Sequence, residues 1–477
     1  MVEHQLPKLR VASSSLVCRS KISVQTAMSS LYLYCWYHLY KKTMKKLTIL
    51  LITVISLAFI SNDKPLDIKE LVDADLPYLV NFYKTRHQNP EISLQEKETA
   101  KTLAAELREI GFEVTENFGG YGIVGILKNG EGPTILYRTD MDALPINEKT
   151  ELAYASKRTT SYNGEQIGTM HACGHDMHMT TWLGTARTMT KMKEQWKGTL
   201  IMIGQPAEEI GAGARLMLNA GLYSQFGVPD YGIGLHSSPT IPAGQVGFGK
   251  GFTMANTESI DIKVFGIGAH GASPHMSVDP IVIASMIVMD LQTIVSRNLK
   301  PIESAVITVG AIKGGIKHNI IPDEVTLKLT VRTYKEEVRV MIHKRIKEIS
   351  RGIALAAGLS DDKLPEVTIP LEYTPANYNN PELVDRLIQS AQSVIGKENV
   401  IDAEKQMVGE DFSMYGQTEE NVPTVLFWLG TVPDERIKSG FLPGLHSPFY
   451  YPEPALSIET GVSVVTRSLL DLFNQQT

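Results

Sequence analysis

The sequence predicts an α/β protein with a mainly parallel sheet and a smaller α+β domain inserted into the chain. Five apolar runs of strand length alternate with stretches that carry apolar residues at helical spacing, which is typical of parallel sheets. A second observation is a change in the order of the expected helices and strands after residue 256, where two strands follow each other without a helix between them. The length of 477 residues, 43% of them hydrophobic, leaves room for both domains. We expect strands at 122–127, 134–137, 199–203, 231–235 and 424–429, and helices at 178–193, 212–224 and 457–474.

The inserted segment, 256–368, has the order β-α-β-β-α-β, which is the ferredoxin-like arrangement. The larger domain is expected to consist of 64–255 and 369–477, on either side of this insertion. Within the insertion we expect strands at 259–266, 304–312, 324–333 and 366–370, and helices at 280–297 and 335–357.

The first 62 residues are not expected to belong to the fold. Met44, two lysines and the apolar run 47–60 match the basic and apolar regions of a secretory signal. This run is shorter than the ~20 residues of a spanning helix, and an uncleaved membrane anchor is the alternative. We therefore expect 44–62 to be a signal peptide or an N-terminal anchor, and the protein to be exported, either periplasmic or secreted. Residues 1–43 are interpreted as a leader from a misassigned start, and the alternative is a genuine basic extension.

The net charge and the cysteine content restrict the partners and the kinds of site that are expected. The net charge of −6 provides no basic surface, so nucleic acid is not an expected partner. Of the three cysteines, Cys18 and Cys35 lie in the leader, and Cys173 is alone in the remaining chain. A single free thiol in an oxidising compartment is a liability unless it is occupied, and metal ligation would occupy it.

The stretch 169–178, TMHACGHDMH, is the most distinctive part of the sequence. Cys173 and His175 are two residues apart, so a loop rather than a helix would bring both to one atom. Thiolate and imidazole are ligands that zinc and similar transition metals prefer. Asp176 is expected to be the N-cap of the helix that follows. The alternative is a polar loop with solvated histidines.

Further polar clusters follow the expected strands, at Asp140 and Asp142, at Glu208 and Glu209, and at His236. Ligands of open α/β sheets bind at the carboxyl ends of the strands, so these clusters are expected to meet there. Adjacent side chains diverge, so one glutamate of the pair could bind metal while the other takes a proton from water. The alternative for Glu208 and Glu209 is a solvated surface pair.

Asp140 and Asp142 share one face of a strand end. They could ligate metal, or they could orient the ligand histidines through hydrogen bonds. We expect Asp140, Asp142 and Asp176 to orient ligands.

Eight motifs together resemble the M20 metallopeptidase family, in its amidohydrolase branch, which includes hippurate, indole-acetyl-amino-acid and N-acyl-amino-acid hydrolases. The resemblance covers about residues 70–475. The motifs are RTDMDALPI, MHACGHDMHM, QPAEEIGAGA, GLHSSP, GAHGASPH, HNIIPDE, GEDFS and GLHSPFY, in this order.

The resemblance implies a hydrolase of N-acyl amino acids that holds two divalent transition-metal ions (zinc, manganese, cobalt or nickel). It implies that Glu208 is the general base and that His270 polarises the scissile carbonyl, often from the partner subunit of a homodimer. It further implies that Asn319 and Arg332 contact substrate, and that the inserted domain is a lid and dimerisation domain. The implied metal ligands are Cys173, His175, Glu209, His236 and His446.

Two rival functions stay open at this point. A dipeptidase or aminopeptidase of the same family would share the metal ligands and differ only in pocket contacts. A binding protein that lost catalysis would be expected to lack Glu208, which is present.

Overall fold

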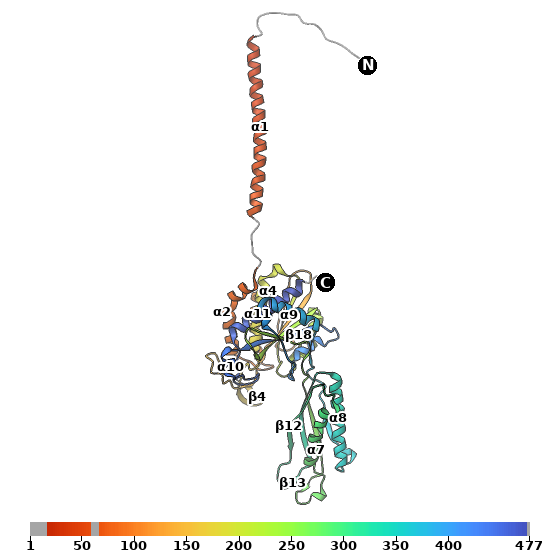
Figure 1. Cartoon of the computed structure of the whole chain (residues 1–477). Coiled ribbons are helices and arrows are strands. Elements are labelled where there is room, and N and C mark those ends of the chain that lie inside the picture. Colours follow the sequence, from red (N-terminus) through yellow and green to blue (C-terminus); the bar gives the residue numbers. More distant parts are fainter. Residues whose placement is uncertain (1–16, 59–65, 475–477) are drawn as a thin grey trace, which may run out of the picture. The chain divides into compact units, whose positions relative to one another are not determined.

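The computed structural model describes residues 17–58 and 66–474, and the chain divides into two units, Met1–Leu66 and Asp67–Thr477 (Figure 1). In the first unit, helix α1 (Val17–Ala58) is continuous and runs through the expected boundary at Met44. The side chains of residues 28–48 are all exposed. The end of the expected signal segment, 59–62, lies outside the described residues.

The second unit is built on an eight-stranded sheet of mainly parallel strands, which confirms the predicted fold class. The central strands β6, β3, β7 and β18 are parallel neighbours, and β1–β2, β2–β6 and β18–β8 are antiparallel pairs. All five predicted strands are present. In spatial order the strands are β1 (Glu113–Thr115), β2 (Ile123–Lys128), β6 (Thr199–Gln205), β3 (Thr134–Asp140), β7 (Tyr231–Pro242), β18 (Thr424–Val432), β8 (Val246–Phe248) and β17 (Val400–Asp402).

Helices cover both faces of this sheet because alternate strand residues point to opposite sides. Tyr137 and Met202 belong to a core formed with five helices, whereas Leu136 and Ile201 belong to a separate core on the other face. The first core contains α2 (Ile68–His87), α3 (Lys97–Glu109), α4 (His175–Lys191), α9 (Pro381–Ile395) and α11 (Pro454–Asn474), and the second contains α5 (Gly213–Asn219), α6 (Leu222–Phe226) and the 3-10 segment η6 (Asp411–Gly416).

The single helix predicted at 212–224 is wrong, since the chain forms two short helices there. Gly221 separates α5 from α6 with a φ of 91°, a left-handed conformation that ends a right-handed helix. The structure also contains short elements that the sequence analysis did not predict. Besides β1, β8 and β17 of the large sheet, they include β4 (Thr159–Tyr162), β5 (Glu165–Gly168), β9 (Gly251–Met254), β16 (Asn377–Asn379) and α10 (Asp434–Ser439).

The inserted segment forms a four-stranded antiparallel sheet in the order β12-β14-β10-β15, with a hydrophobic core of its own. The order of its main elements is the predicted β-α-β-β-α-β. A small extra strand pair, β11 (Ala269–His270) with β13 (Ile320–Ile321), was not predicted. The main elements are β10 (Glu258–Phe265), α7 (Pro280–Thr293), β12 (Ala305–Gly314), β14 (Glu324–Thr333), α8 (Glu336–Ala356) and β15 (Glu366–Thr368).

Helix α7 has two apolar faces. Ile283 and Ile287 are buried against the inserted sheet, whereas Val282, Met286 and Met289 are 53%, 54% and 71% exposed. Among the described residues searched, Pro280–Asn298 is the one stretch long and apolar enough to span a membrane, and 33% of it is buried. Its buried face belongs to the inserted domain's core, so length and composition here are weak evidence for a membrane span.

Candidate active site

The loop before α4 places Cys173 and His175 at the carboxyl edge of the large sheet. Gly174 lies between them with a φ of 82°, and a Cβ there would meet Ser237 Oγ at 2.8 Å. Glycine is therefore required for this close turn. The expectation that Asp176 caps α4 is wrong: Gly174 occupies the N-cap position, and Asp176 lies in the first turn.

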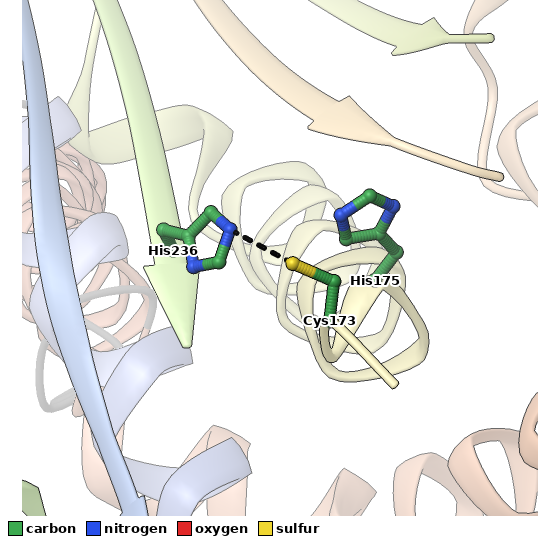
Figure 2. Close-up of side chains that lie close together, drawn as sticks. All are labelled: Cys173, His175 and His236. Carbon is green, nitrogen blue, oxygen red and sulfur yellow. Dashed lines mark hydrogen bonds between the residues drawn. The ribbon is translucent and has the colours of Figure 1, made fainter. Parts of the chain in front are cut away.

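The structure brings all five expected metal ligands and Glu208 together. Ligand atoms within 4.8 Å of one another form overlapping groups: Cys173 with His175 and His236, Cys173 with Glu209 and His446, and His175 with Glu208 and Glu209. Cys173 Sγ lies 3.5 Å from Nε2 of His236 on β7. Figure 2 shows these two side chains together with that of His175.

Burial excludes the two solvated alternatives. The side chain of His175 is 1% exposed, and those of Glu208 and Glu209 are 10% and 6% exposed. His446 is the outer member of the group, with a side chain that is 53% exposed and an Nε2 that lies 3.3 Å from Glu209 Oε2. Its backbone N–H donates to Ala172 O at 2.8 Å, which ties the C-terminal segment to the loop.

Asp142 and Asp140 hold histidines of the cluster in place. His175 Nδ1 lies 2.8 Å from the backbone oxygen of Asp142, so Nε2 of this ring faces the other ligands. Asp140 Oδ1 lies 2.7 Å from His178 Nδ1, and His178 Nε2 accepts from the Ser237 N–H beside His236. Both aspartates therefore orient the site, although Asp140 also lies within ligand distance of His175 and His178.

Asp176 does not contact a ligand histidine, so this part of the expectation is wrong. Its Oδ2 lies 2.6 Å from Nδ1 of His87 on α2, and Nε2 of His87 lies 3.1 Å from Glu148. Because helical side chains at neighbouring positions diverge, Asp176 points away from the side occupied by His175. It links the ligand helix α4 to α2.

The donor set fits divalent transition-metal ions. His175 Nε2 and Glu209 Oε1 are buried and have no hydrogen-bond partner in the described part of the chain. Burial and the nearby carboxylates raise the pKa of the Cys173 thiol well above its usual value, and burial raises the pKa of Glu209 to about 8. Bound cations would offset both effects by stabilising the charged forms. One thiolate with imidazoles and a carboxylate suits zinc-like ions better than calcium or magnesium.

A cavity of about 520 Å³ opens beside the cluster. Arg332, on β14 of the inserted domain, lines the same cavity, and among the described residues its guanidinium donates to the backbone oxygen of Val331 at 3.3 Å and forms no ion pair with a carboxylate. Burial lowers the pKa of Arg332, which indicates a guanidinium without a compensating anion. Apolar parts of the wall come from Ile210, Met254, Val408, Trp428 and Leu445.

His270 and Asn319 lie outside the ligand cluster and its cavity. They are neighbours at the β11–β13 pair, where Gly271 N donates to Asn319 O at 2.9 Å, and neither lines the cavity. Figure 1 places β13 at the end of the inserted domain away from the large sheet. Within one chain, these two residues are therefore not brought together with the ligand cluster.

A buried ionic network beneath the site was missed by the sequence analysis. Arg138 is 1% exposed and bonds to Asp140 at 2.7 Å, to Glu410 at 2.9 Å and to Asp411 at 3.1 Å. Glu410 and Asp411 also group with Glu208. The RTDMD and GEDFS motifs contained this signal, but no local pattern shows that segments 272 residues apart meet.

The α/β fold, the five clustered donors and the adjacent glutamate are the arrangement of a metal-dependent hydrolase. The chain belongs to peptidase family M20/M25/M40, whose model matches residues 136–471. This confirms the resemblance seen in the motifs.

Individual relatives favour the amidohydrolase branch. The chain is 39% identical over 339 residues to a hippurate hydrolase of Campylobacter jejuni, covering 70% of this chain and 84% of the relative. It is 36% identical over 355 residues to an N-acetylcysteine deacetylase of Bacillus subtilis, covering 74% and 88%. The solved structure of Bacillus subtilis YXEP protein, described as a dinuclear metal-binding peptidase, matches with a TM-score of 0.67 and 29% identity, covering 84% and 99%.

Proposed function

We propose that this protein hydrolyses the amide bond of N-acyl amino acids with two divalent transition-metal ions, namely zinc, manganese, cobalt or nickel. The observation that carries this proposal is one cavity bordered by the ligand cluster, by Glu208 and by the guanidinium of Arg332, which forms no ion pair within the described part of the chain. Similarity to hippurate hydrolase and N-acetylcysteine deacetylase supports an acyl amino acid as substrate.

The residues around the cavity would have different roles in the reaction, according to their positions. Cys173, His175, Glu209, His236 and His446 would hold the two ions, which when bound acidify a water molecule and polarise the scissile carbonyl. Glu208 accepts a proton from the attacking water and returns it to the leaving nitrogen, so that the products are a carboxylic acid and an amino acid. Arg332 pairs with the carboxylate of the amino acid, and a bidentate pair would fix the amide in the cavity.

We further propose that the protein acts as a homodimer through the inserted domain, which would serve as lid and dimerisation domain. The exposed apolar residues of α7 and the edge position of β12 support this surface. His270 would then polarise the carbonyl, and Asn319 would contact substrate, in the site of the partner subunit. Their position outside the cavity of their own chain agrees with this arrangement.

The N-terminal segment is proposed to direct export to the periplasm or the exterior, with membrane anchoring as the alternative. The basic residues at 45–46 and the apolar run after them support this proposal. Mass spectrometry of the protein from its native host should find a mature N-terminus near residue 61. A protein that keeps residue 1 and stays in the cytoplasm would contradict export.

The substrate proposal is tested by two substrate panels after chelation and re-addition of each metal. One panel contains N-acetyl, benzoyl and indole-acetyl amino acids, and the other contains dipeptides. We expect metal-dependent cleavage of the acyl amino acids. Cleavage of dipeptides alone would make the protein a peptidase of the same family, and metal binding without any cleavage would favour a binding protein.

A further inference from the structure

Glu96 stands at the N-cap position of α3, yet its side chain does not cap the helix. That role falls to Glu91, whose carboxylate accepts from Glu98 N at 3.2 Å and from Thr99 N at 2.7 Å. Glu96 is fully buried, and its Oε1 instead accepts from Leu94 N at 3.0 Å and from Ala207 N at 2.8 Å. A buried carboxylate is costly unless it is well bonded, so this orientation requires an explanation.

Glu96 binds the turn that carries Glu208 and Glu209. Ala207 is fully buried and has a φ of 56°, a left-handed conformation that residues with a side chain seldom adopt. Such a conformation persists only where the surroundings hold it, and it is often found at functional sites. Glu96 binds the N–H of this strained residue, which directly precedes Glu208.

A second buried carboxylate binds the peptide N–H group that follows Glu208. Asp142 Oδ2 accepts from Glu209 N at 3.0 Å, so the peptide N–H groups before and after Glu208 are both bound by carboxylates. Within the described part of the chain, the Glu208 carboxylate itself accepts no hydrogen bond, and the basic side-chain nitrogen within 4 Å of it is His175 Nε2, at 3.9 Å. The backbone therefore fixes where Glu208 points.

We propose that Glu96 is a positioning residue that fixes the general base Glu208 by holding the strained Ala207 N–H. The inference rests on the proposed role of Glu208 and assigns a function to a residue outside every motif of the site. Glu96 acts through backbone geometry and does not touch substrate or metal ligands. Because small displacements of a reacting group cost rate rather than binding, kcat is expected to depend on Glu96 more than KM does.

The test compares substitutions at Glu96 with a matched one at Glu91. Glu96→Ala removes the acceptor and should lower kcat by about 10- to 100-fold, with KM and metal content little changed. Glu96→Gln keeps an oxygen that can accept both N–H groups and should retain most of the activity. Glu91→Ala removes a carboxylate from the same loop and should lower stability while leaving kcat unchanged.

Glu96→Asp keeps the chain folded if Glu96→Ala does not. Aspartate is a good N-cap for α3, and its shorter side chain withdraws the oxygen from Ala207 N. We therefore expect a stable protein with reduced kcat. Wild-type kcat in Glu96→Asp or Glu96→Ala, or an equal loss in Glu91→Ala, would overturn the proposal.

Hydrogen exchange of the peptide that contains residues 205–210 gives a readout independent of activity. The Ala207 amide should exchange faster in Glu96→Ala and Glu96→Asp than in wild type, and should stay protected in Glu91→Ala. Unchanged protection would contradict the inference even if the enzyme were active. If the wild type shows no metal-dependent turnover, the proposed function fails, and the exchange data still decide whether Glu96 holds the turn.

Discussion

Glu208 and Glu209 are adjacent in the sequence and have different surroundings. Glu209 lies with Cys173 and His446 in one group of possible ligands, whereas Glu208 also groups with Glu410 and Asp411. Burial, followed by the charges of Glu410 and Asp411, raises the pKa of Glu208 well above its usual value. A carboxylate that is costly to ionise accepts a proton readily, which suits Glu208 to the role of base.

Glu208→Gln is expected to reduce turnover strongly without loss of metal. The amide has the same shape but cannot accept the proton of water, so kcat should fall by about 100- to 10,000-fold. Metal content, measured by elemental analysis after dialysis, should equal that of the wild type. Glu209→Gln is the matched control and should lose metal as well as activity. Retained turnover in Glu208→Gln would remove it as the base.

His87 supplies a prediction about pH and stability. Burial opposes its charge, but Asp176 and Glu148 together raise the pKa of His87 to about 9. Because this value exceeds the unfolded pKa of about 6.5, its stabilising effect is complete below pH ~6.5 and is lost as the pH rises through about 9. His87→Gln should therefore lower the free energy of unfolding by on the order of 3 kcal/mol at pH 6, and by much less above pH 9.

Urea unfolding of wild type and His87→Gln across this pH range measures the difference. Each protein loses stability at extreme pH for other reasons, so the quantity of interest is the gap between the two curves. A gap that stays constant from pH 6 to pH 10 would show that the charge of His87 does not contribute.

At the scale of elements, the long apolar runs predicted the structure well and the short ones did not. Strands β3 and β6 are buried along almost their whole length, and each contains an apolar run, ILY or LIMI, that is recognisable in the sequence. Short strands such as β8 and β17, at one end of the sheet, depend on partners distant in the sequence, and no local period marks them.

The same distinction applies to the site. Ligand types within a short loop, such as Cys173 and His175, are visible in the sequence because their chemistry is local. Asp176 was assigned to the wrong partner because His87 lies 89 residues away in the chain. Glu96 was not singled out because its hydrogen bond to Ala207 spans 111 residues. Residues whose role arises only from long-range contacts need the fold to be known.

Helix α7 allows a test of the proposed dimer. Its exposed apolar face includes Met286, and a charge there would have to be desolvated in a dimer. Met286→Asp should therefore give a monomer by light scattering, and its activity should fall because His270 is proposed to serve the partner's site. Val340→Asp on α8, at a residue equally exposed, is the control and should stay dimeric and active. A fully active monomer, in the variant or in wild type, would contradict the proposed role of the inserted domain.

For the whole molecule, metal ions are expected to stabilise the fold that creates their site. The five donors come from the start of α4 and the loop before it, the turn after β6, strand β7 and the segment before α11, so bound ions would connect four distant parts of the chain. Ions that bind the folded state and not the unfolded one add about 4 kcal/mol of stability at a thousand times the dissociation constant. Chelation should therefore lower Tm substantially.

Thermal unfolding after chelation and re-addition of each ion measures this effect. Zinc, manganese, cobalt or nickel should restore Tm, whereas calcium and magnesium should not, because a thiolate and imidazoles are poor ligands for hard cations. Cys173→Ser should weaken this response relative to wild type, because it removes the thiolate from the donor set. The metal centre would be refuted by an equal Tm in chelated and reloaded protein. An equal response in Cys173→Ser and wild type would instead show that Cys173 is not a ligand.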